Sequence, residues 1–123
     1  MKILVAEDDP LILRTIETRL KKDGHEVVIT SDGRSALQHL ASDNPDLIIT
    51  DIMMPYISGL EIIVAVKQAG RKIPIVILSG MGQENTVLEA FKLGADDYIT
   101  KPFSPNELSI RIKRLSLSMI SGN

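Results

Sequence analysis

The sequence predicts a doubly wound α/β domain, in which helices cover both faces of a parallel β-sheet. Short apolar runs and amphipathic segments alternate five times along the chain, with short connections between them. That alternation is typical of parallel strands joined by right-handed helical crossovers. The apolar runs are hydrophobic at successive positions, as expected for strands that are buried on both faces.

Composition limits the classes of protein to which the chain can belong. The 123 residues suffice for one core, and 44% hydrophobic with 24% charged residues is ordinary for a globular domain. The absence of cysteine excludes disulfides, thiolate metal sites and a cysteine nucleophile. A net charge of −2 gives no basic patch for nucleic acid, and no signal peptide or membrane-spanning run is visible. We therefore expect one cytoplasmic domain over residues 1–123, without nucleic-acid or membrane contact.

The first unit is a strand followed by a helix. The strand is the apolar run at residues 3–6, and three consecutive acids follow it: Glu7, Asp8 and Asp9. Asp9 with Pro10 behind it predicts a helix start, because Asp caps free backbone amides and Pro fits the first turn. Apolar residues recur at helical spacing until Gly24 ends the helix.

The next unit and the third strand have clear boundaries. Residues 27–29 predict the second strand, and residues 31–33 form the turn into a second helix. Residues 44–45, Asn-Pro, break that helix. The third strand follows at residues 47–50 and ends at Asp51, a lone carboxylate after an apolar run.

The second half of the chain repeats this pattern. Ser58 and Glu61 form a capping box that opens a helix ending at Gly70, and residues 73–78 form a fourth strand before Ser79. The next helix runs from about Gln83 to Leu93 and is stopped by Gly94. We expect its inner face to consist of Val87, Leu88, Ala90 and Phe91. The last unit has a strand at residues 97–100, a second capping box at Ser104–Glu107, and inward-facing Leu108, Ile112 and Leu115.

Three carboxylates follow the ends of two predicted strands. If the first and third strands are neighbours, Glu7, Asp8 and Asp51 meet at the carboxyl edge of the sheet, where open α/β sheets bind ligands. Clustered carboxylates repel one another unless a cation lies among them, and carboxylate oxygens suit Mg2+. Zinc fits poorly, since His25 and His39 lie away from the carboxyl ends of the strands.

Two further polar residues reach the same edge. Ser79 ends the fourth strand and Lys101 follows the fifth. A hydroxyl donor and an ammonium beside a metal-bound carboxylate would form a pocket for a tetrahedral anion. Asp51 could attack phosphorus in line there, because phosphoryl transfer needs mainly positioning and electrostatic stabilisation. The alternative is that Ser79 only caps a turn and Lys101 only pairs with a neighbouring acid.

Four segments carry a family resemblance that covers essentially the whole chain. They are ILVAEDD at residues 3–9, DIMMP at 51–55 with Gly59 behind it, LSG at 78–80, and GADDYITKPF at 94–103. In this order and at these intervals they resemble the receiver domain of a bacterial two-component response regulator. The resemblance implies a flavodoxin-like five-stranded sheet, (βα)5, with strand order 2-1-3-4-5.

The resemblance also implies a role for each matching residue. Asp51 would be phosphorylated by a partner sensor histidine kinase or phosphotransfer protein. Asp8 would bind Mg2+ directly, Glu7 through water, and the backbone carbonyl of Met53 would be another ligand. Lys101 would contact the phosphoryl group, and its bond to Pro102 would be cis. The chain would catalyse only its own phosphoryl transfer and autodephosphorylation.

A switch and an output face are implied as well. Ser79 would turn towards the phosphoryl group and Tyr98 would swing inward behind it, changing the surface of the fourth helix, fifth strand and fifth helix. Four charged residues resemble the set through which winged-helix response regulators dimerise: Asp96, Asp97, Glu107 and Arg111. Lys92 and Val87 match that set less well. The alternative is that these charges form a solvated face.

Three other functions compete with a phosphorylation switch. A hydrolase with an aspartate nucleophile would carry a second aspartate at the position of Met53, together with a cap domain. A nucleotide or flavin binder would carry a glycine-rich loop where the acids of residues 7–9 stand. A receiver that serves only as a docking module, never phosphorylated, is opposed by the complete acceptor set.

Overall fold

The computed structural model describes residues 1–120 and forms the predicted sheet and helices. Along the chain the elements are β1 (Lys2–Ala6), α1 (Pro10–Lys22), β2 (Glu26–Thr30), α2 (Gly33–Ser42), β3 (Leu47–Asp51), α3 (Gly59–Gln68), β4 (Ile75–Ser79), α4 (Glu84–Leu93), β5 (Asp97–Thr100) and α5 (Pro105–Ile120). All strand pairs are parallel, in the order β2-β1-β3-β4-β5. The fold class and the strand order are confirmed, while the predicted end of the domain, residues 121–123, lies outside the described residues.

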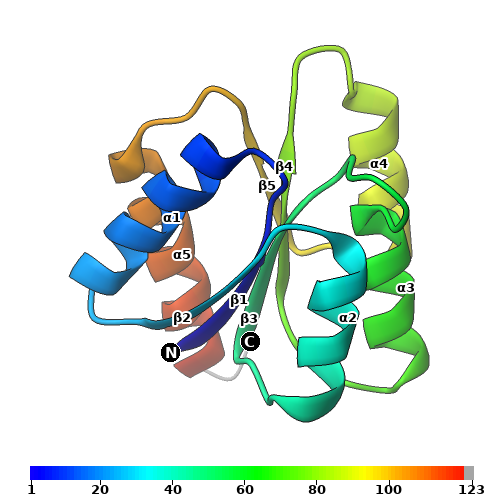
Figure 1. Ribbon diagram of the computed structural model, residues 1–123, viewed down its shortest axis with the longest axis horizontal. Coiled ribbons are helices and arrows are strands. Elements are labelled where there is room, and N and C mark those ends of the chain that lie inside the picture. Colours follow the sequence, from blue (N-terminus) through cyan, green and yellow to red (C-terminus); the bar gives the residue numbers. More distant parts are fainter. Residues whose placement is uncertain (121–123) are drawn as a thin grey trace.

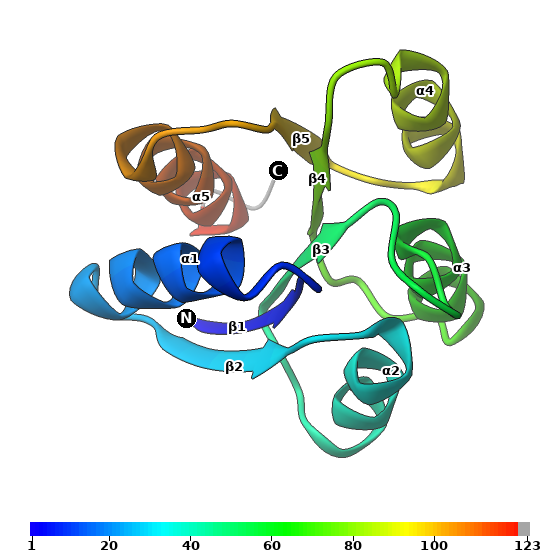
Figure 2. The same cartoon turned by 45° about the horizontal axis from the view of Figure 1, so that its top comes forward.

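Helices cover both faces of the sheet. One face carries α1 and α5, and the other carries α2, α3 and α4 (Figure 1). Figure 2 shows the same two layers from a second direction. Within residues 1–120, every helix is too short or too polar to cross a membrane.

Successive strand residues enter two different cores, which explains why the strands are apolar throughout. In β1, Leu4 and Ala6 belong to the core beneath α2, α3 and α4. Their neighbours Ile3 and Val5 belong to the core beneath α1 and α5. All four are at most 2% exposed. A strand buried on both faces has no position at which a polar side chain reaches water, until the strand ends.

Local hydrogen bonds cap the helices at the predicted start positions. The Asp9 carboxylate accepts from the backbone amides of Leu11 and Ile12, and Pro10 is the first residue of α1. The Ser58 hydroxyl accepts from the amide of Glu61 at 3.4 Å. Ser104 and Glu107, at the start of α5, form the corresponding bond at 3.1 Å. Each cap satisfies amides that have no partner within the helix.

Two predicted details were wrong. The fourth strand begins at Ile75, two residues later than expected, because Pro74 has no N–H to donate to a neighbouring strand. In α4, Val87 and Ala90 are buried as expected, but Leu88 is 59% exposed and Phe91 is 39% exposed. These two residues lie on the side of α4 towards β5, and β5 is an edge strand with no further strand beyond it.

Arg71 ties the segment before β4 to the segment before β3. Its guanidinium donates to the backbone carbonyl of Leu40, to that of Asp43 at 3.3 Å, and to the side-chain oxygen of Asn44 at 2.7 Å. These acceptors lie at the end of α2 and in the loop that leads to β3. One side chain therefore holds the entry to the strand that ends at Asp51.

Replacing Arg71 with alanine should lower the free energy of unfolding by about 1–2 kcal/mol, because charged hydrogen bonds to several acceptors are lost. Urea unfolding of both proteins would measure the difference. Lys72→Ala is a matched control, since Lys72 is exposed and should contribute less than about 0.5 kcal/mol. Equal stabilities for the two variants would contradict the role assigned to Arg71.

Candidate functional site

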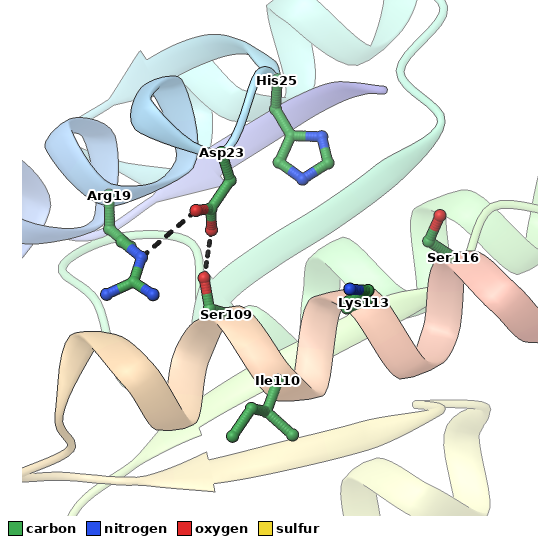
Figure 3. Close-up of a pocket in the computed structure, with 7 residues that line it drawn as sticks. All are labelled: Arg19, Asp23, His25, Ser109, Ile110, Lys113 and Ser116. Carbon is green, nitrogen blue, oxygen red and sulfur yellow. Dashed lines mark hydrogen bonds and ion pairs between the residues drawn. The ribbon is translucent and has the colours of Figure 1, made fainter.

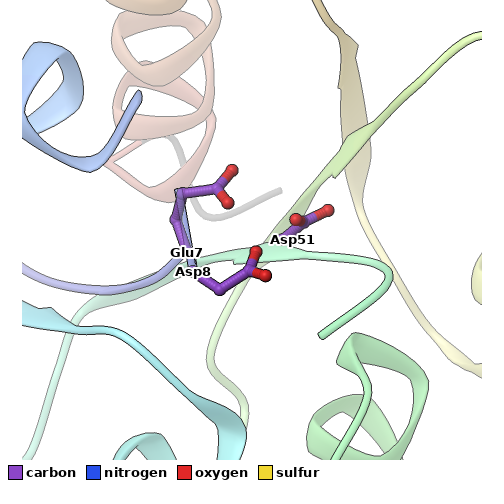
Figure 4. A group of neighbouring side chains, drawn as sticks. All are labelled: Glu7, Asp8 and Asp51. Atoms are coloured by element: carbon purple, nitrogen blue, oxygen red, sulfur yellow. The ribbon is translucent and has the colours of Figure 1, made fainter. Parts of the chain in front are cut away.

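Three carboxylates meet at the carboxyl edge of the sheet. Glu7 and Asp8 directly follow β1, Asp51 is the last residue of β3, and these strands are neighbours. One oxygen of each carboxylate lies within 4.8 Å of those of the other two (Figure 4). Glu7 is 0% and Asp51 is 6% exposed, whereas Asp8 is open to solvent. The structure therefore brings together the three acids that the sequence singled out.

Lys101, which directly follows the edge strand β5, completes the cluster at the same carboxyl edge of the sheet. Its ammonium lies 2.6 Å from Glu7 Oε1 and 3.0 Å from Asp51 Oδ2. The backbone amide of Lys101 donates to the carbonyl of Ser79 at 2.7 Å, which fixes the start of the side chain beside β4. The bond from Lys101 to Pro102 is cis, as the resemblance implied. One ammonium thus faces two buried carboxylates at once.

Burial controls the protonation of this cluster. It raises the pKa of Glu7 to about 7, against the opposing effects of Lys101 and of the Asp9 amide, which donates to Glu7 at 3.0 Å. The charge of Asp51 adds to the increase. Burial by itself lowers the pKa of Lys101, but its hydrogen bonds to Glu7 and Asp51 outweigh that effect and raise it. The Lys101 ammonium therefore stays charged, while Glu7, with a pKa of about 7, is about half ionised at neutral pH.

The donor set fits a divalent cation. Mg2+ prefers hard oxygen ligands, binds one or two carboxylates, and keeps several waters. Here three carboxylates converge, one of them open to solvent, and the buried one at Glu7 carries a raised pKa that a nearby cation would lower again. Glu7, Asp8 and Asp51 are therefore the residues that could hold Mg2+.

Glu7→Gln should make the metal-free protein more stable at pH 8, by about 3 kcal/mol. The pKa of Glu7 is raised from 4.5 in the unfolded chain to about 7, so the folded state binds the extra proton. Stability should then fall as the pH rises from 4.5 to 7, and the loss should be complete above pH 7. The variant should lack this loss, and the two proteins should be alike near pH 4.5.

Urea unfolding in EDTA across this pH range would measure the difference. The exposed Glu89→Gln provides a control with the same change of charge and should keep the pH dependence of the original chain. If Glu7→Gln kept it too, the raised pKa of Glu7 would be wrong.

Ser79 and Tyr98 line one cavity next to the cluster. In the sheet, Asp51 lies opposite Leu78, so Ser79 lies one residue nearer the carboxyl edge. Ser79 is 2% exposed, and Tyr98 is 38% exposed with its ring edge-on to Phe91 at 5.8 Å. A cavity of about 520 Å³ is lined by the loop after β4, by α4 and by β5, and both side chains belong to its wall. The Ser79 hydroxyl and the half-exposed Tyr98 ring thus border the same cavity.

Three of the four charged residues of the expected dimer face, Asp96, Asp97 and Arg111, are engaged within the chain. Asp97 accepts from Arg111 at 2.9 Å and from Arg114 at 2.8 Å, and Asp96 accepts from the backbone amide of Ile75 at 2.8 Å. Arg114 was missed in the sequence. Its spacing of three residues from Arg111 places both guanidinium groups on one side of α5, a signal that could have found it.

The chain belongs to the response regulator receiver domain family. The family model matches residues 3–113, which includes the carboxylates, Ser79 and Lys101. The fold and the acidic edge described above thus occur in a chain of the class that acts as the signalling switch of two-component systems.

Curated relatives and solved structures agree with this family. The alkaline phosphatase synthesis transcriptional regulatory protein PhoP of Bacillus subtilis is 38% identical over 114 residues, 93% of this chain and 48% of that protein. The response regulator SaeR of Staphylococcus epidermidis is 40% identical over 121 residues, 98% of this chain and 52% of that protein. The chain spans about half the length of the curated relatives it matches.

Two solved structures have the same fold over nearly their whole length. The receiver domain of the Francisella response regulator 1452 superposes with a TM-score of 0.88 and 36% identity, covering 96% of this chain and 98% of that one. The receiver domain of NtrX from Brucella abortus has a TM-score of 0.86 and 32% identity, covering 91% of this chain and 95% of that one.

Proposed function

We propose that Asp51 accepts a phosphoryl group from a sensor histidine kinase or a phosphotransfer protein in the cytoplasm. The observation that carries this proposal is the arrangement of Lys101, which contacts both Asp51 and Glu7 where the three carboxylates meet. This arrangement holds a nucleophilic oxygen beside a fixed positive charge. Phosphoryl transfer asks little more of a protein than such positioning and charge.

In the proposed step, an oxygen of Asp51 forms a bond to phosphorus as the bond from phosphorus to the donor nitrogen breaks. The leaving imidazole takes up a proton, and Asp51 becomes an acyl phosphate. Lys101 then faces the new phosphoryl oxygens and offsets part of their charge. Attack of water on the same phosphorus returns Asp51 and phosphate, so the chain catalyses only its own transfer and autodephosphorylation.

Glu7, Asp8, Asp51 and the backbone carbonyl of Met53 would hold Mg2+. When bound, that ion supplies positive charge to the phosphoryl oxygens and to the crowded carboxylates. Asp8 is exposed to solvent and Glu7 is buried, which fits direct coordination by Asp8 and coordination through water by Glu7. The backbone amide of Met53 donates to Asp51 Oδ1 at 3.4 Å, whereas Lys101 contacts Oδ2, so the two donors together orient the Asp51 carboxylate.

The signal would pass from the new phosphate to the face formed by α4, β5 and α5. The Ser79 hydroxyl lies at the carboxyl end of β4, and its turn towards the phosphate would leave room in the shared cavity for Tyr98 to move inward. Phosphorylation would thereby shift the equilibrium between two conformations of this face. The cavity of about 520 Å³ supports such a movement, because both side chains line it.

A phosphorylation-dependent homodimer would use Asp96, Asp97, Glu107 and Arg111. Asp97 would then exchange an arginine of its own chain for one of the partner copy. Sedimentation with and without a phosphate mimic such as beryllofluoride should show a monomer converting to a dimer. A monomer in both conditions would contradict this part of the proposal.

Intact mass spectrometry after incubation with acetyl phosphate tests phosphoryl acceptance itself. The chain should gain one phosphoryl group with Mg2+ present and none with EDTA. No gain by a folded, Mg2+-binding protein would instead support a receiver that acts only as a docking module. A gain that does not depend on Mg2+ would contradict the metal site.

A further inference from the structure

The two helices on one face of the sheet are strongly basic. Together α1 and α5 contain seven Lys or Arg and two Asp or Glu residues, a net charge of +5. The three helices on the other face contain three basic and three acidic residues, and the whole chain has a net charge of −2. Since α1 and α5 lie side by side (Figures 1 and 2), this charge forms one layer.

Two exposed aliphatic side chains lie on the outer side of this layer. Ile110 is 67% and Leu117 is 58% exposed, although the inward Leu108 and Ile112 of the same helix are almost fully buried. Ile110 and Leu117 are seven residues apart, which places them on one side of α5 about 10 Å from each other. Lys113 stands between them. Ile110 and Leu117 therefore face water and do not pack in the core.

A groove between the two helices is lined in part by Ile110 and Lys113, and Leu117 lies outside its lining. It has a volume of about 440 Å³, with Arg19, Asp23 and His25 on one wall and residues of α5 on the other (Figure 3). The Asp23 carboxylate is already occupied, because it accepts from Arg19 at 3.3 Å and from the Ser109 hydroxyl. Lys113 forms no ion pair with any residue of 1–120. The groove therefore presents a cation and no free acid.

We propose that this α1–α5 surface (Arg19, Ile110, Lys113 and Leu117) binds an acidic amphipathic helix of a partner protein. Two aliphatic side chains of that helix, one heptad apart, would pack against Ile110 and Leu117. Its carboxylates would pair with Lys113 and with the basic end of α1. Binding of a helix in a groove commonly uses anchors at this spacing, and opposite charge fixes the partner and the orientation.

Two other classes of partner fit less well. Single-stranded nucleic acid bound without base-edge contacts is usually held by stacking on aromatic rings, and no Phe, Tyr or Trp is among the described residues that line the groove. A membrane-surface helix inserts a wide apolar face, but the apolar face of α5 is buried in the core, and within residues 105–119 its most exposed Leu or Ile side chains are Ile110 and Leu117. The proposal does not depend on phosphorylation, since the groove includes the loop before β2, at the opposite edge of the sheet from Asp51.

Titration of the full chain with a stapled helical peptide would test the proposal. The peptide carries two leucines seven residues apart, flanked by glutamates, and a second peptide carries lysines in place of the glutamates. We expect saturable binding of the first peptide alone, with amide shifts confined to α5 and the second half of α1. Lys113→Glu and Ile110→Asp should each weaken binding about tenfold.

Lys92→Glu on α4 is the matched control, because it makes the same change of charge on the opposite face and should leave the affinity unchanged. All variants should accept phosphate from acetyl phosphate as the original chain does, which verifies their fold. Equal weakening by Lys92→Glu, shifts elsewhere, or no saturable binding would overturn the proposal. Tighter binding of anionic vesicles or duplex DNA to the same residues would also overturn it and assign the surface to that partner.

Discussion

Asp51→Asn should reduce phosphoryl acceptance from acetyl phosphate at least 100-fold, to below detection, because an amide lacks the anionic oxygen that attacks phosphorus. The fold should survive the change. Asp51 lies at the end of β3 and its carboxylate is held by Lys101 and by the amide of Met53, where an asparagine side chain of the same shape fits. Intact mass after incubation with Mg2+ and acetyl phosphate measures the effect.

Asp46→Asn is a stringent control for that experiment. Asp46 precedes the same strand at its other end, where its carboxylate accepts from the backbone amide of Lys2 at 2.8 Å. An asparagine oxygen can accept the same bond, so this variant should be phosphorylated normally. Phosphorylation of Asp51→Asn at the rate of the Asp46→Asn control would remove Asp51 from the acceptor role.

Lys101→Met should destabilise the metal-free protein by about 2–3 kcal/mol at pH 8, since it leaves two buried carboxylates without a cation. Glu7 and Asp51 are 0% and 6% exposed, so water cannot replace the ammonium effectively. Addition of Mg2+ should restore most of the loss, because a bound divalent ion supplies charge at the same carboxylates. Urea unfolding in EDTA and in excess Mg2+ gives both values.

Lys72→Met is the control for loss of a lysine, because Lys72 is exposed on the loop before β4. It should change stability by less than about 0.5 kcal/mol, with or without Mg2+. If Lys101→Met unfolded at the same urea concentration as this control, the ammonium would not be stabilising the acidic cluster. The opposite signs expected for Lys101→Met and Glu7→Gln distinguish electrostatic effects from simple loss of packing.

Much of the fold could be predicted because its determinants are local. Asp9, Ser58 and Ser104 act within three residues of their own positions, and Pro and Gly mark the breaks between elements. The inward face of α4 could not be predicted correctly, since Leu88 and Phe91 are apolar yet lie where the edge strand β5 leaves them uncovered. Helical periodicity alone does not predict which part of a wide apolar face will pack against another element.

The carboxylate cluster could be anticipated because parallel strands deliver their ends to a common edge. The raised pKa of Glu7 could not, because it depends on the extent of burial and on contacts between segments far apart in the sequence. Lys101 lies 50 residues beyond Asp51 and still bridges it to Glu7. In the same way, Asp97 is engaged by Arg111 and Arg114, which only the packing of α5 against β5 brings into reach.

Reductive trapping of the phosphorylated chain tests the central claim most directly. Borohydride reduces an acyl phosphate, and it converts a phosphorylated aspartate to homoserine. After treatment with acetyl phosphate, Mg2+ and borohydride, peptide mass spectrometry should find homoserine at position 51 and aspartate at positions 8 and 9. Homoserine at either of those other positions, or at none in a protein that has gained a phosphoryl group, would contradict the assignment of Asp51 as the acceptor.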